Sequence, residues 1–172
     1  MEGKTQTRLP AVELGVNVAA LVQIDVFSVN RYQSDEIERA AFLTWRLDPD
    51  EDGRERTLRD SFIRLPVTWD GYPALNEKSK FYNRLSAVYG ERFAVDRVRW
   101  TLELPEPYNS PEGLEAVPHW DERNTDGFEP VTVKSVTVEG VELLGRSAYI
   151  EVAQRGEYLR IVGANPMPRN EF

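Results

Sequence analysis

The chain has 172 residues, of which 41% are hydrophobic and 10% aromatic, enough for one domain with a real core. It contains no cysteine, which excludes disulfides and thiolate metal sites and favours a reducing compartment. No apolar run approaches the roughly 18 residues of a membrane span, and residues 1–15 lack the layout of a signal peptide. We therefore expect a single soluble, cytoplasmic domain over residues 1–172, with no membrane partner.

The net charge of −8 comes mostly from one segment. Residues 103–129 contain eight carboxylates against a single arginine, Arg123, so the rest of the chain is close to neutral. Net charge governs solubility and long-range attraction more than the character of one local face. A basic surface elsewhere on the protein is therefore compatible with the overall acidity.

Three strand patterns open the chain. Residues 16–27 alternate apolar and polar side chains and are rich in β-branched residues, which predicts a long strand. After a polar turn at 31–38, residues 41–47 alternate again. The Asp- and Gly-containing run 48–53 is a strong turn signal, and a third strand is expected at 54–65. Together these patterns predict an antiparallel three-strand meander.

One helix is predicted after the meander. Asn76 is the expected N-cap, and Phe81, Leu85 and Val88 form an apolar stripe at helical spacing. Gly90 suits the position just beyond the helix, where the backbone turns left-handed.

The rest of the chain predicts strands around one irregular segment. Residues 92–104 favour an additional strand, whereas 103–130 are rich in Pro, Asn, Gly and acids and predict a long acidic loop. Three later strands are expected at 131–138, 148–152 and 158–162, with a link over 141–146 and a tight turn at 154–156. Residues 165–172 are expected to form an irregular tail, because their prolines cannot continue a sheet interior.

The order of these elements indicates a fold class. A three-strand meander, a helix and a closing hairpin follow one another as in the five-stranded oligonucleotide-binding (OB) barrel. We therefore expect a mainly β protein: an OB-type barrel with one helix between strands 3 and 4 and a long acidic loop.

Three stretches carry a resemblance to a known family. They are Leu43–Leu47 on the second predicted strand, Asn76–Tyr82 opening the helix, and Leu143–Val152 leading through Tyr158–Ile161 to Pro166. In this order they resemble a family of bacteriophage and prophage OB-fold proteins related to single-stranded-DNA-binding proteins. The resemblance implies a role in DNA replication or recombination, contact with the proteins of those processes, and location in the host cytoplasm. The acidic segment at 103–129 departs from that family.

The residues offer little for catalysis. His119 is the only histidine, and metal sites and catalytic triads need converging partners. Asp48, Asp50 and Asp52 resemble the start of a calcium loop, but Arg59 stands where its bidentate acid belongs. Neither a phosphate-binding glycine loop nor a nucleophile elbow is present. We expect no enzymatic activity, no cofactor and no metal.

Arginines and aromatic rings interleave on the second and third predicted strands, which favours binding of single-stranded DNA or RNA. Phe42 and Arg46 should share an outward face of the second strand, while Trp45 fills the barrel. On the third strand Arg56, Phe62 and Arg64 have one parity and form the matching set. Cations near the helix, including Arg84, would add phosphate contacts. The full set predicted to bind is Phe42, Arg46, Arg54, Arg56, Phe62, Arg64, Lys78 and Lys80.

Other interpretations remain open. Asp52, Glu55 and Asp60 could pair with the arginines and leave a merely solvated surface. The protein could instead be an adaptor or assembly component, homo-oligomeric or not, that pairs through the exposed edges of the barrel. The acidic loop 103–130 could keep the protein soluble, compete for the basic face, or dock a basic partner. An acidic mimic of DNA is disfavoured, because the charge is confined to one segment.

Overall fold

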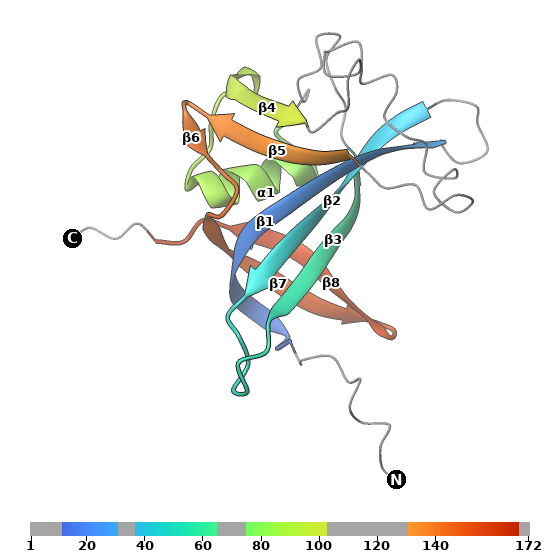
Figure 1. Ribbon diagram of the computed structural model, residues 1–172, viewed down its shortest axis with the longest axis vertical. Coiled ribbons are helices and arrows are strands. Elements are labelled where there is room, and N and C mark those ends of the chain that lie inside the picture. The colour runs from blue at the N-terminus through green and yellow to red at the C-terminus, as the bar shows by residue number, and fades with distance from the viewer. Residues whose placement is uncertain (1–11, 31–36, 65–74, 103–130, 169–172) are drawn as a thin grey trace.

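The structure is a computed structural model that describes residues 12–30, 37–64, 75–102 and 131–168. Within these ranges the fold is mainly β, with one α-helix, α1 (Lys80–Tyr89), and one 3-10 turn, η2 (Val95–Arg97) (Figure 1). The strands are β1 (Gly15–Asn30), β2 (Ile37–Leu47), β3 (Arg56–Arg64), β4 (Val98–Leu102), β5 (Val131–Val138), β6 (Val141–Glu142), β7 (Ser147–Arg155) and β8 (Tyr158–Asn165). No helix in the described ranges is long and apolar enough to cross a membrane.

The predicted meander is confirmed in β1, β2 and β3, which pair in sequence order and antiparallel. Leu21 and Ile24 of β1 and Trp45 of β2 lie in the core with no exposed surface. Leu21 and Ile24 are three positions apart, so regular alternation would separate them, and the register shift between Leu21 and Gln23 turns both toward the core. Both β1 and β2 are longer than the sequence pattern suggested: β1 runs to Asn30 and β2 begins at Ile37.

The long strand β1 joins two parts of the sheet. Its first residues pair with β7, its middle and end pair with β2, and Asp25 and Val26 also pair with β5. The register with β2 shifts between Leu21 and Gln23, where an irregularity of this kind bends and twists a strand. Figure 1 shows β1 as a long curved ribbon that reaches from the β7–β8 hairpin to β5.

The additional strand expected within 92–104 is present as β4, and 131–138 forms β5 as predicted. These two strands pair with each other, and the short β6, which lies in the predicted link 141–146, pairs with β5. In Figure 1 this small group lies beside α1, away from the β7–β8 hairpin.

The sheet stays open between β3 and β8. The strand order runs β3-β2-β1-β5-β4, with β7 joined to β1 and β8 joined to β7 alone, so no ladder links β8 to β3 in the described ranges. The fold expectation is therefore confirmed as mainly β with one helix, while the structure has eight strands in an open antiparallel sheet instead of a closed five-stranded barrel.

The helix α1 begins three residues later than its sequence signal suggested. Ser79, not Asn76, is the N-cap: its hydroxyl accepts a hydrogen bond from the Tyr82 backbone N–H, whereas Asn76 stabilises the preceding turn. Gly90 ends the helix at a φ of 105°, as expected for a left-handed cap. The predicted stripe of Phe81, Leu85 and Val88 is buried against the sheet.

Candidate nucleic-acid interface

The arginines of the turn between β2 and β3 are already engaged by the protein's own acids. Arg54 contacts Asp50 at 2.9 Å and Asp52 at 3.4 Å. Arg56 forms an ion pair with Glu13 at 3.1 Å, and its Nε donates to the Asp48 carbonyl oxygen at 2.6 Å. Two of the predicted binding residues, Arg54 and Arg56, therefore already donate hydrogen bonds to groups of the protein itself.

The acids that pair with Arg54 and Arg56 have lowered pKa values. The pKa of Asp50 lies below its ordinary value, chiefly because the backbone N–H of Arg54 donates to its carboxylate, with further help from the N–H of Asp52 and the charge of Arg54. The pKa of Glu13 is lowered by a hydrogen bond from its own backbone N–H and then by Arg56. An ionised carboxylate keeps its arginine close to the turn.

The prediction that Phe42 offers an exposed ring on the outward face of β2 is wrong. This ring is only 6% exposed, and the guanidinium of Arg59 lies over it at 4.9 Å from the ring centroid. A base cannot stack on a face that a side chain covers. Trp45 is fully buried, as predicted.

The prediction that Arg56 faces outward on β3 is also wrong. Leu58 packs on the core and Asp60 is buried, whereas Arg59, between them, is exposed. Arg56 therefore belongs to the inward-facing series, and Arg59 is the outward cation of this strand. The side chains of Phe62 and Arg64 lie outside the described residues, so their predicted role stays a prediction.

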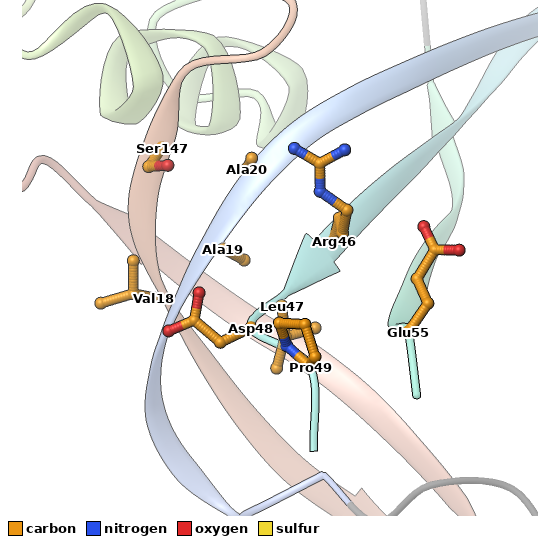
Figure 2. Close-up of a pocket in the computed structure, with 9 residues that line it drawn as sticks. All are labelled: Val18, Ala19, Ala20, Arg46, Leu47, Asp48, Pro49, Glu55 and Ser147. Atoms are coloured by element: carbon orange, nitrogen blue, oxygen red, sulfur yellow. The ribbon is translucent and has the colours of Figure 1, made fainter. Parts of the chain in front are cut away.

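Arg46 is exposed as predicted, but its surroundings are mixed in charge. It lines a shallow pocket of about 200 Å³ at the end of β2, together with Asp48 and Glu55 (Figure 2). No second cation lines that pocket, although the two acids do. Phosphate would meet two negative charges for one positive charge there, which disfavours a backbone contact.

The predicted helix cations divide into two kinds. Lys78 and Lys80 are exposed, and Lys80 opens α1. Arg84 is not a surface cation: it is 2% exposed, and its Nε donates to Asp60 at 2.6 Å. Arg84 is therefore excluded from direct phosphate contact.

A different group of cations surrounds a groove that the sequence did not single out. The hairpin groove, as we call it, has a volume of about 350 Å³ and lies between β3, the start of α1 and the β7–β8 hairpin. Its polar and aromatic lining consists of Arg59 and Asp60 from β3, Lys80 from α1, and Arg155, Tyr158 and Arg160 from the hairpin.

The described residues supply no ion pairs that neutralise the cations of the hairpin groove. In the described part of the chain, no carboxylate lies within salt-bridge distance of Arg59, Lys80, Arg155 or Arg160. The one acid lining the groove is Asp60, whose charge is balanced by Arg84. The groove therefore has an excess of about four positive charges, in contrast to the turn between β2 and β3.

An aromatic ring stands beside these cations. Tyr158 is 76% exposed, the most exposed large hydrophobic side chain of the described residues. The register pairs it with Arg155 across the hairpin, so both side chains lie on one face, and Arg160 shares that face two residues on. A flat ring between two guanidinium groups suits a base with its flanking phosphates.

Sequence reasoning missed Arg155, Tyr158 and Arg160, because it placed Arg155 in the turn. In the structure the turn consists of Gly156 and Glu157, and Arg155 is the last residue of β7. A two-residue hairpin loop pairs its flanking positions, so the spacing of Arg155 and Tyr158 was the available signal.

The candidate calcium loop finds no support in the geometry. Asp50 is occupied by Arg54 and by turn backbone groups, and the described residues contain no cluster of His, Asp or Glu arranged to hold a metal ion. His119 lies outside the described residues.

A scan against models of protein families, a search of curated proteins and a search of solved structures each found no match.

Proposed function

We propose that this protein is a non-catalytic single-stranded nucleic-acid-binding protein, of the kind that serves DNA replication or recombination in phages and prophages. The observation that carries the proposal is the hairpin groove, where four cations without an ion pair to any described carboxylate surround an exposed tyrosine. Proteins of this class bind by neutralising phosphates and stacking bases on aromatic rings, without turnover of the ligand.

The topology supports the same proposal at a finer level. β1, β2, β3, β7 and β8 correspond in order to the five strands of an OB barrel, with α1 after the third strand and β4 to β6 as an insertion. OB barrels are partly open, and they bind oligonucleotides through strands 2 and 3 and the loop between strands 4 and 5. In this correspondence the hairpin groove lies between strand 3 and that loop.

The residues that we propose to bind differ from those that the sequence favoured. Arg59, Lys80, Arg155 and Arg160 take the role first given to Arg54 and Arg56, and Tyr158 takes the role of Phe42. Of the original set, Lys80 stays within the site, and Lys78 lies two residues from it in sequence.

The test is a fluorescence anisotropy titration of a labelled oligo-dT over a range of salt concentrations. Each phosphate contact on a single strand contributes about 0.7 to the slope of log affinity against log salt, so four contacts give about 3. Arg155→Ala with Arg160→Ala should lower that slope by about 1.4. Arg54→Ala with Arg56→Ala is the matched control and should leave the slope unchanged. Absence of saturable binding at low salt would refute the proposal.

A further inference from the structure

The open side of the sheet is bridged by one buried side chain. Arg84 of α1 donates from Nε to the Asp60 carboxylate of β3 at 2.6 Å and from Nη2 to the Ile161 carbonyl oxygen of β8 at 3.2 Å. Its remaining nitrogen, Nη1, donates to the Asn83 side chain at 2.6 Å. Arg84 thus joins two strands that no backbone ladder connects.

The neighbouring residue of α1 holds β8 at a second point. Asn83 donates from its side-chain amide to the Ala164 carbonyl oxygen at 3.1 Å and accepts from the Ala164 N–H at 3.2 Å. These two bonds keep the end of β8 on the helix. Arg84 adds a direct link from Ile161 to β3, besides the ladder that pairs Ile161 with Val152 of β7.

The two strand residues that Arg84 holds are each adjacent to a groove cation. Asp60 follows Arg59, and Ile161 follows Arg160; the inner residue of each pair is buried and the outer one is exposed. Because successive side chains of a strand point to opposite faces, fixing the inner pair also fixes the separation of the outer pair. Both outer cations line the hairpin groove.

We propose that Arg84 is a positioning residue of the nucleic-acid site: it sets the width of the hairpin groove, so that Arg59 and Arg160 contact one strand together. This inference rests on the proposed function of the groove. Arg84 itself does not touch the ligand. A buried ion pair often contributes no net stability over apolar residues of similar volume, which agrees with a geometric role for this one.

The test is a double-mutant cycle in oligo-dT binding. The clasp variant, Asp60→Leu with Arg84→Met, replaces the buried pair by apolar side chains and should keep the fold. It should bind about tenfold more weakly, a loss of about 1.4 kcal/mol. Arg160→Ala should weaken binding about fivefold in the parent but less than about twofold in the clasp variant, because the two effects are coupled.

The control changes an exposed ion pair without altering net charge. Glu77→Gln with Arg92→Gln removes the contact at 2.7 Å outside the groove, and Arg160→Ala should keep its full effect in that background. If the clasp variant binds oligo-dT with parental affinity, and Arg160→Ala weakens binding equally in the parent and in the clasp variant, the positioning role is wrong. The proposed function would stay intact.

A second readout works without any ligand. Since the chain has no cysteine, Thr57→Cys and Val162→Cys would be its only two thiols, both at exposed positions, on β3 and β8. Spin labels there should give a narrow distance distribution in the otherwise unaltered chain and a broader one in the clasp variant. Equal widths would refute the positioning role of Arg84. This readout holds even if oligo-dT binding fails and the proposed function is wrong.

Discussion

The turn between β2 and β3 and the hairpin between β7 and β8 both concentrate arginines at a strand end, yet only one keeps them available. At the turn, Arg54 and Arg56 face Asp50, Asp52 and Glu13 within ion-pair distance. At the hairpin groove no such acid reaches the arginines among the described residues. Counting cations therefore does not locate a phosphate site; the placement of carboxylates decides it.

The same contrast holds for the two Asp–Arg pairs themselves. In the first pair the side chains of Arg54 and Asp50 are 56% and 16% exposed, whereas those of Arg84 and Asp60 are 3% and 5% exposed. Water screens the first pair, but the second has no solvent to replace a lost partner.

The largest expected effect comes from breaking the buried pair on one side only. Arg84→Ala should lower the free energy of unfolding by about 3–5 kcal/mol, because Asp60 would remain as an uncompensated buried charge. Arg54→Ala, the exposed counterpart, should change it far less. Urea unfolding followed by tryptophan fluorescence measures both, and equal costs would show that burial does not separate the two pairs.

The next largest effect tests the availability of the arginines. Arg59→Glu with Arg160→Glu should weaken oligo-dT binding by about 100-fold, equivalent to about 2.7 kcal/mol, since two attractive contacts become repulsive. Arg54→Glu with Arg56→Glu should have a much smaller effect. A larger loss from the turn variant would return the site to the residues first predicted from the sequence.

Much of the fold was predictable because it depends on local patterns. Alternation located β1, β2 and β5, and helical spacing located the stripe of Phe81, Leu85 and Val88. The N-cap was misplaced because Asn76 and Ser79 are both good caps, and local sequence does not decide which residue starts the helix. The open side between β3 and β8 depends on long-range pairing, which local patterns do not contain.

The site was harder to predict for a related reason. Parity alone does not say which face of β3 is buried: Arg56 and Asp60 face inward because they pair with Leu47 and Leu43 of β2, which lie in the core. The pairing of Arg56 with Glu13 spans 43 positions in sequence, so no local signal announces it. Arg84 links the neighbours of Arg59 and Arg160, Asp60 and Ile161, in a contact that the sequence alone does not indicate.

A smaller effect should follow from the exposed ring of the groove. Tyr158→Ala should weaken oligo-dT binding by about tenfold, because base stacking on an aromatic ring contributes about 1–3 kcal/mol. Tyr158→Phe keeps the ring and should keep most of the affinity, which separates stacking from loss of the hydroxyl. If both variants bind like the parent, the ring plays no part and only the cations remain in the proposal.

The smallest effect concerns the turn, and it asks whether charge holds Arg54 there. Because the pKa of Asp50 is lowered in the folded protein, its contribution to stability is complete above the ordinary value of 3.8 and is lost as pH falls through the lowered pKa. Asp50→Asn should therefore lower the Tm slightly at neutral pH, and the difference from the parent should shrink as pH falls below 3.8. Thermal unfolding at a series of pH values measures this convergence. A difference that stays constant with pH would mean that folding does not lower the pKa of Asp50, so the turn would not favour the ionised partner of Arg54 and the contrast with the hairpin groove would weaken.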